Sequence, residues 1–201
     1  MRAILNGLAA AAVVAALAAP ASAQLAGQSA AALTINTHPA KDGDKLTVTS
    51  TSFKAGAAIP KKYSAFDANV APALSWSAGP AGTVAYVVIV EDPDLGATRP
   101  PYLHWILGDL TAKTTSVSEG LKETPMGGFQ TGASIGENKL AWFGPKPPAG
   151  TGTHHYTFQV FALDKRLGLY DGSTLKDVQA AMKDHVLASG AIQATYDAPP
   201  K

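Results

Sequence analysis

The segment from Val84 to Trp105 constrains the fold of this chain more than any other part of the sequence. It opens with Val84 to Glu91, a run of mostly apolar and β-branched residues that ends at Asp92-Pro93-Asp94. Such a run predicts a central strand that is buried on both faces. Pro93 has no N–H for a strand ladder, and its ring disfavours a helical conformation at Asp92. We therefore expect the strand to stop here and to deliver two carboxylates to one edge of a sheet.

A second apolar strand is predicted at Leu103 to Leu107, with His104 near its beginning. If the two strands share a sheet, His104 returns to the neighbourhood of Asp92 and Asp94. Two carboxylates and a histidine at one sheet edge form the best candidate site in the sequence.

A third apolar strand is predicted at Tyr156 to Leu163, directly after His154 and His155. Adjacent residues of a strand point to opposite faces. We therefore expect only one of these two imidazoles to face the candidate site.

The weaker patterns complete a mainly β prediction. Leu33 to Asn36 and Lys45 to Ser50 show the period of two of half-buried strands and are interpreted as an antiparallel pair. Gly108 to Gly144 is polar and rich in Gly and Thr, and its length is typical of functional or mobile loops.

One helix is predicted after the N-terminal segment, at Ser173 to Ser189. Ser173 or Thr174 can cap its start and Gly190 its end. Apolar residues recur at helical spacing within it; they are Leu175, Val178, Met182 and Val186. Ala191 to Tyr196 is expected to form a short final strand.

Residues 1–23 have the pattern of a secretory signal peptide. Arg2 precedes the apolar run from Leu8 to Ala19, and Ala21-Ser22-Ala23 fits the small-residue cleavage rule. The run is shorter than the roughly 20 residues that span a bilayer. We expect cleavage after Ala23, a periplasmic or secreted product without stable membrane insertion, a flexible leader at residues 24–32 and one domain at residues 33–197.

Composition excludes several classes of function. The whole chain has 16 basic and 15 acidic residues, and removal of Arg2 with the signal peptide leaves 15 of each. Such a balance gives no electrostatic footprint for nucleic acid. The chain has no cysteine, which excludes disulfides, thiol catalysis and thiolate metal sites.

Two enzymatic alternatives have weak support. Gly132-Ala133-Ser134-Ile135-Gly136 matches the G-x-S-x-G nucleophile elbow, but it lacks the strand before it and the helix after it that the motif needs. The Asp and His residues could ligate zinc or manganese, but no His-x-His or H-E-x-x-H spacing specifies a geometry. We predict neither a catalytic residue nor a metal or other cofactor.

The same Asp and His residues are better suited to an anion pocket. Imidazole N–H groups and the backbone N–H groups of Gly- and Pro-rich turns can surround a phosphate or a carboxylate. One carboxylate would then hold an imidazole in its donor tautomer. Asp92 could instead cap its own turn, and both roles are compatible.

Several motifs together resemble the phosphatidylethanolamine-binding protein family, and in particular its bacterial Raf-kinase-inhibitor-like branch. They occur in the family's order and spacing and cover about residues 33–197. The motifs are Asn69 to Trp76, Asp92-Pro93-Asp94, His104-Trp105, Gly144-Pro145 with Pro147-Pro148, Gly152 to Tyr156, and Asp184 to Ala188, which resembles the G-H-V-L-A helix of that branch.

The resemblance implies a large antiparallel sheet packed against a smaller sheet, with a C-terminal helix. It also implies a small cavity for phosphate-like anions and phospholipid head groups. The residues that it assigns to this cavity are Asp92, His104, His154, Pro147 and Pro148, with Asp94 and Tyr156 in support.

This sequence departs from the family pattern at two places. Leu95-Gly96 follows the Asp-Pro-Asp motif where the family usually has Ala-Pro, so the pocket rim is expected to differ. His155 stands where the family commonly has Arg, which removes a permanent cation.

The resulting hypothesis is an exported, non-enzymatic protein that binds a small anion such as phosphate or phosphoethanolamine. The alternative is an inhibitor or regulator that meets a protease or kinase partner through its surface. The sequence leaves the natural ligand, the protein partner, the oligomeric state and the role of the Gly108 to Gly144 segment open.

Overall fold

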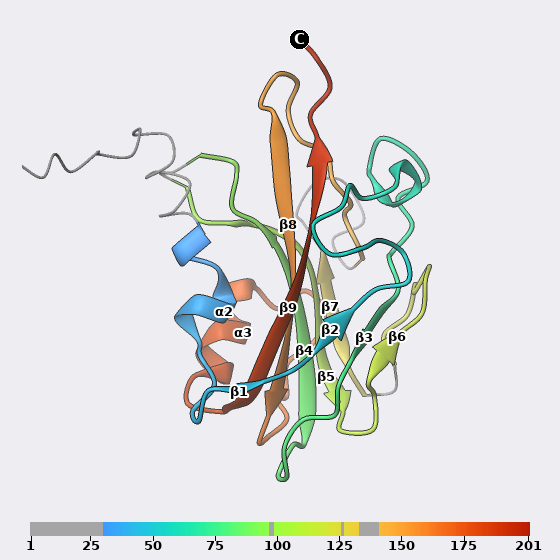
Figure 1. The fold of residues 1–201 in the computed structure, drawn as a ribbon. Coiled ribbons are helices and arrows are strands. Elements are labelled where there is room, and N and C mark those ends of the chain that lie inside the picture. The colour runs from blue at the N-terminus through green and yellow to red at the C-terminus, as the bar shows by residue number, and fades with distance from the viewer. Residues whose placement is uncertain (1–29, 97–98, 126, 133–140) are drawn as a thin grey trace, which may run out of the picture.

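The protein folds into two β-sheets, and the two α-helices that the structure describes lie on the face of the larger sheet that is turned away from the smaller one (Figure 1). The computed structural model describes residues 30–96, 99–125, 127–132 and 141–201. Its elements in chain order are α2 (Thr34–Thr37), β1 (Asp44–Lys45), β2 (Val48–Thr49), the 3-10 helix η1 (Lys61–Tyr63), β3 (Leu74–Trp76), β4 (Ala85–Asp92), β5 (Tyr102–Thr111), β6 (Ser116–Val117), β7 (Phe129–Gly132), β8 (Thr153–Leu163), α3 (Leu175–Met182) and β9 (Val186–Asp197).

The larger sheet has the strand order β1-β9-β8-β4-β5-β7, and the smaller sheet has the order β2-β3-β6. All pairs are antiparallel except that of β1 with β9, so the larger sheet is mixed. This architecture confirms the predicted mainly β class with two sheets and a C-terminal helix. The three predicted apolar strands are β4, β5 and β8, and they lie next to one another.

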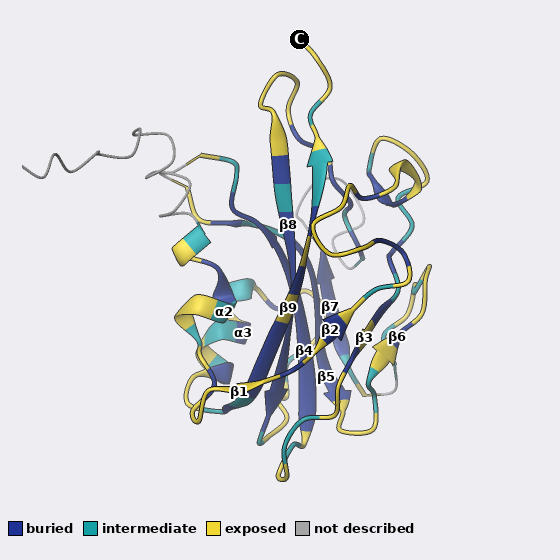
Figure 2. Ribbon diagram, in the orientation of Figure 1, coloured by how far each residue is buried: buried dark blue, intermediate teal, exposed yellow. Residues whose placement is uncertain are grey.

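Strand β4 is buried along its whole length, as its apolar run predicts (Figure 2). Tyr86 and Val88 belong to the hydrophobic cluster that the smaller sheet shares. Val87 and Ile89 point the other way, into a cluster with Val178 of α3. The central strand therefore supplies the core on both sides, because successive side chains alternate across a sheet.

The predicted antiparallel pair near the N-terminus is wrong. Residues 33–36 fall mostly in α2, because side chains on the sheet accept hydrogen bonds from the backbone N–H groups of this segment. Thr34 N–H donates to a carboxylate oxygen of Glu91 at 2.9 Å, and Ile35 N–H donates to the side-chain oxygen of Gln159 at 2.6 Å. The second expected strand is divided between β1 in one sheet and β2 in the other.

The predicted C-terminal helix begins where expected but ends early. Thr174 and Asp177 form a reciprocal capping box, whereas Asp184 has a left-handed φ of 63° just after α3. Val186 already begins β9 and shares the hydrophobic cluster of Val178. The helical spacing of these apolar residues arises because they share one hydrophobic cluster, although they do not belong to one continuous helix.

The same error extends to the end of the chain. The G-H-V-L-A-like segment, Asp184 to Ala188, is not helical and enters a strand. The final strand is the twelve-residue β9, longer than the predicted Ala191 to Tyr196. Gly190 does not end a helix; it lets Leu46 cross closely, because a Cβ on Gly190 would lie 2.0 Å from the Leu46 carbonyl oxygen.

The segment from Gly108 to Gly144 contains more regular structure than its polar composition predicts. It includes the end of β5, the two-residue β6 and the edge strand β7. Strand β7 ends at Gly132, so the expectation that no strand precedes the G-x-S-x-G match is wrong; of the match itself, only Gly132 belongs to the described residues. Residues 1–29, which include the predicted signal peptide and most of the predicted leader, lie outside them. None of the helices described is long and apolar enough to cross a membrane.

Candidate functional site

A cavity of about 170 Å³ opens where β4, β5 and β8 meet, at the upper end of the larger sheet in Figure 1. Polar groups from these strands form part of its wall, and an aromatic residue and a proline-rich turn form the rest. The lining residues are Asp92, Leu95, Tyr102, His104, Phe143, Lys146, Pro147, Pro148 and Tyr156.

Strand register brings the polar residues together. Asp92, the last residue of β4, pairs with Tyr102 at the start of β5, and His104 follows two residues later. On the other side Glu91 pairs with Thr157, so Asp92 and Tyr156 lie at the same end of that ladder. Side chains two residues apart share a face of the sheet.

Asp92 has both of the roles considered for it from the sequence. Its Oδ1 accepts a hydrogen bond from the Asp94 backbone N–H at 2.7 Å, which closes the turn around Pro93. Its Oδ2 lies 2.7 Å from Nδ1 of His154, and both side chains are at most 3% exposed. Asp92 therefore orients the histidine from its turn while it also lines the cavity.

His154 is fixed at both ring nitrogens and does not line the cavity. Its Nε2 lies 2.8 Å from the Thr151 hydroxyl, which donates its only proton to the Pro148 carbonyl oxygen at 2.7 Å. Nε2 must therefore be a donor, and Nδ1 faces a carboxylate. Desolvation alone would lower the pKa of His154, but the hydrogen bond and charge of Asp92 outweigh it and raise that pKa.

His104 has the opposite character. It is 3% exposed, and its Nδ1 lies 2.6 Å from the Phe143 carbonyl oxygen, which can only accept a hydrogen bond. Desolvation lowers the pKa of His104 to about 4, so the ring is neutral at physiological pH. The Nδ1–H tautomer leaves Nε2 as an acceptor. The prediction that both imidazoles offer donors to an anion is therefore not supported at His104.

Tyr156 supplies a buried hydroxyl. The residue is fully buried, and its hydroxyl has no hydrogen-bond partner among the residues that the structure describes. Desolvation, and then the nearby Asp92 carboxylate, raise the pKa of the phenol, which therefore stays protonated. A buried polar group without a partner is costly unless a ligand or water supplies one.

The remaining predicted residues divide between the cavity and its support. Pro147 and Pro148 line the cavity. Asp94 does not; its Oδ2 accepts hydrogen bonds from the backbone N–H of His155 at 2.6 Å and from Nδ1 of the same residue at 2.9 Å. As the strand alternation predicts, His154 and His155 meet different carboxylates.

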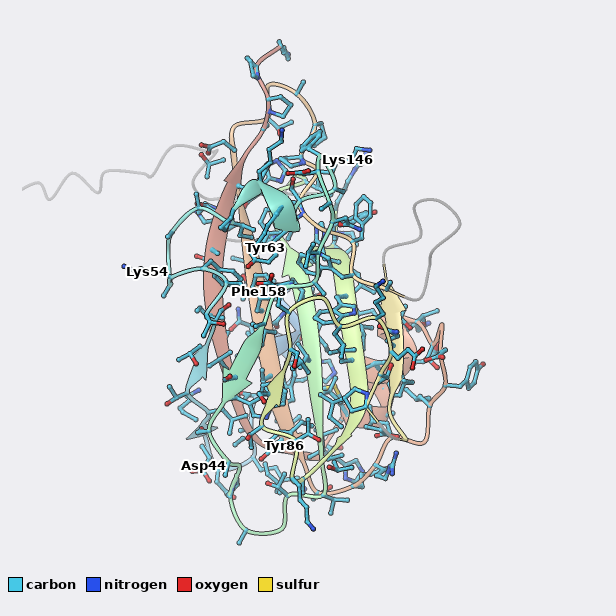
Figure 3. The ribbon with its side chains drawn as sticks, turned by 90° about the vertical axis from the view of Figure 1, so that its right-hand side faces the viewer. Asp44, Lys54, Tyr63, Tyr86, Lys146 and Phe158 are labelled. Atoms are coloured by element: carbon cyan, nitrogen blue, oxygen red, sulfur yellow. The ribbon has the colours of Figure 1, made fainter. Side chains whose placement is uncertain are left out.

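Sequence reasoning placed Leu95 at the pocket rim but missed three other lining residues, Tyr102, Phe143 and Lys146. Of the missed residues, Lys146 was the easiest to find from the sequence, because it stands between Pro145 and Pro147 of the Pro-rich motif. Figure 3 shows it at the upper end of the molecule. Its ammonium group is the one permanent cation among the described lining residues.

Within the described ranges, no group of three or more His, Cys, Asp or Glu side chains is arranged to hold a metal ion. Asp92 and His154 are engaged with each other, and Asp94 is engaged with His155. The site therefore offers a cavity with fixed polar walls.

Comparisons with known proteins agree with this architecture. Residues 49–197 match the phosphatidylethanolamine-binding protein family. A Mycobacterium tuberculosis protein provisionally named lipoprotein LppC is 43% identical over 154 residues, which cover 77% of this chain and 72% of that protein.

Two solved structures show the same fold. A phosphatidylethanolamine-binding protein homologue from Chlamydia trachomatis has a TM-score of 0.66 at 32% identity and covers 76% of this chain and 97% of its own. YbcL of E. coli, described as a member of the mammalian family, has a TM-score of 0.69 at 26% identity, covering 76% and 98%. The family match spans most of the sequence and the fold agrees with it, so this chain belongs to the phosphatidylethanolamine-binding protein family.

Proposed function

We propose that this protein is an exported, non-enzymatic binding protein whose cavity holds a small anionic group, such as phosphate or a phospholipid head group. The observation that carries the proposal is Tyr156, which lines the cavity and whose fully buried hydroxyl lies near the Asp92 carboxylate but has no hydrogen bond of ordinary geometry to the described residues. An oxygen of the bound anion would accept a hydrogen bond from this hydroxyl. The family's name, which refers to phosphatidylethanolamine, points to the same class of ligand.

Lys146 supplies the charge that such a ligand needs. It is exposed at the mouth of the cavity, whereas His104 is buried and neutral. An exposed ammonium group attracts an anion with a strength that falls as salt rises. We expect the ligand's negative charge to lie toward Lys146 and its neutral oxygens toward Tyr156.

Export is proposed from the N-terminal pattern of residues 1–23 and from the name of the mycobacterial relative. A lipid attached to cysteine does not carry over, because this sequence contains no cysteine. Mass spectrometry of protein recovered from the periplasm should give a chain that begins at Gln24. A mass that includes residues 1–23 would contradict this part of the proposal.

Calorimetric titration with phosphate and with phosphoethanolamine tests the binding function. We expect saturable binding, which Tyr156→Phe weakens about tenfold through the loss of one hydrogen bond. Lys146→Met should also weaken binding, and more at low salt than at high salt. Lys54→Met is the matched control, because Lys54 is exposed and lies away from the cavity (Figure 3).

Failure to bind either compound would refute the anion pocket and direct attention to protein partners. Binding that responds equally to Lys146→Met and Lys54→Met would place the anion elsewhere. His154→Ala is a poor test, because it would leave Asp92 buried without its partner and so disturb the fold as well as the site.

A further inference from the structure

The inner wall of the cavity contains more hydrogen-bond acceptors than donors. Asp92 contributes two carboxylate oxygens, each of which accepts one hydrogen bond within the protein and has the capacity to accept another. His104 contributes Nε2, an acceptor because Nδ1–H is committed to the Phe143 carbonyl. The donors of this wall are the hydroxyl groups of Tyr102 and of the more deeply buried Tyr156, which lies near the Asp92 carboxylate.

The charges follow the same division. Lys146 lies at the exposed mouth, while the Asp92 carboxylate lies inside and is balanced by His154 behind it. A fully deprotonated anion pushed inward would place its oxygens against acceptors of the same sign. An anion that carries a proton would instead satisfy those acceptors and leave its charge toward Lys146.

We propose that this cavity selects anions that bring their own hydrogen-bond donor, which the anion directs to Nε2 of His104 or to the Asp92 carboxylate. The inference rests on the proposed anion-binding function and narrows its ligand class. The donor is the P–OH of a singly protonated phosphate monoester or the ammonium group of an ethanolamine phosphate. A site built to meet a donor rejects an analogue of equal size that lacks it.

The decisive comparison is between methyl phosphate and methyl sulfate, titrated calorimetrically into the wild-type protein. At about pH 5 both are monoanions of similar shape, but only methyl phosphate has a proton, since a phosphate monoester loses its second proton near pH 6. We expect methyl phosphate to bind at least about tenfold more tightly there, which is the effect of one satisfied hydrogen bond.

The pH dependence of methyl phosphate binding gives a second test, because attraction by charge alone and donation by the P–OH group predict opposite changes in affinity. At about pH 8 methyl phosphate is a dianion, so attraction to Lys146 alone would strengthen its binding, whereas loss of the P–OH should weaken it. Titration of Asp92, His104, His154 or the two lining tyrosines would alter the binding of methyl sulfate too. Because methyl sulfate does not titrate in this range, the ratio of the two affinities isolates the ligand's proton.

Phosphoethanolamine separates the two sources of the donor, because its ammonium group stays protonated at about pH 8. If phosphoethanolamine still binds at about pH 8 while methyl phosphate does not, the ammonium group is the donor. If neither compound binds at that pH, the donor is the P–OH group. His104→Phe should reduce the preference for methyl phosphate over methyl sulfate. Lys146→Met, at the surface and therefore safe for folding, should weaken the binding of both ligands at about pH 5, where both are monoanions, and leave the ratio of their affinities unchanged.

Equal affinity for methyl sulfate and methyl phosphate at about pH 5 would refute the selection of anions that carry a donor, but it would not refute the anion pocket. Tighter binding of methyl phosphate at about pH 8 than at about pH 5 would have the same consequence. If none of the three compounds binds, the proposed function fails together with this inference.

Discussion

The neutral, buried state of His104 predicts a specific pH dependence of stability. Its pKa is about 4 in the folded protein, against an ordinary value of 6.5, because desolvation penalises the charged ring. The unfolded chain therefore binds this proton more readily than the folded protein does. Stability contributed by His104 is complete above pH 6.5 and is lost as the pH falls toward 4.

The size of the effect follows from the two values. A difference of about 2.5 pKa units corresponds to about 3 kcal/mol once the pH lies below both, and to about 2 kcal/mol at pH 5. His154 acts in the opposite direction, since its pKa is raised: its contribution is present at low pH and is lost as the pH rises through the folded value. A variant is needed to separate the two.

Urea unfolding of wild type and His104→Asn at pH 7.5 and pH 5 provides that separation. The asparagine amide takes the position of Nδ1, so it can still donate to the Phe143 carbonyl, but it does not titrate. We expect the wild type to lose about 2 kcal/mol more than the variant between these two values. Equal losses in both proteins would refute a buried neutral His104, as would an imidazole that titrates near 6.5 by NMR.

Three further substitutions test the packing around the site and the corrected ends of the chain. Asp92→Asn should cost about 3–5 kcal/mol of unfolding free energy, because it removes one partner of a buried pair, and it should also lower the pKa of His154 as measured by NMR; an unchanged pKa would contradict the pairing. Gly190→Ala should cost about 1–3 kcal/mol in urea unfolding, because its Cβ would meet the Leu46 carbonyl; a neutral effect would show that the segment between β1 and β2 is free to move away from β9. Thr174→Ala should cost about 1 kcal/mol in thermal unfolding through loss of the helix cap, whereas Thr174→Ser should be nearly neutral.

The position of the site could be predicted because its main residues are tied to strand ends. The apolar run before Pro93 required a buried strand that stops at Asp92, and His104 begins the next strand. Alternation along a strand then predicted that only one of His154 and His155 would face the candidate site. These inferences need only backbone rules that apply wherever a strand forms.

Lys146 and Phe143 could not be placed in the same way. They come from the chain around the Pro-rich turn, whose path depends on contacts such as that between the Phe143 carbonyl and His104. The role of His104 Nε2 as a hydrogen-bond acceptor also depends on that carbonyl, and no sequence pattern predicts this contact. The resemblance to the family supplied the turn, but not the direction of its hydrogen bonds.

Errors of secondary structure arose where tertiary contacts override local preference. Leu33 to Asn36 alternates like a strand, yet Glu91 and Gln159 hold it as a short helix on the sheet. Val186 extends the apolar spacing of α3, yet it reaches the same core from a strand.

The sequence by itself determined the mainly β class, the buried central strand and the position of Asp92 and His104 at the same end of the sheet. It could do so because the hydrophobic periodicity of a strand and the effect of proline on the backbone are local properties. Tertiary structure decided which imidazole is charged, which hydroxyl is left without a partner and which lysine stands at the mouth. Those properties depend on desolvation and on hydrogen bonds between segments far apart in the chain, such as Asp92 with His154.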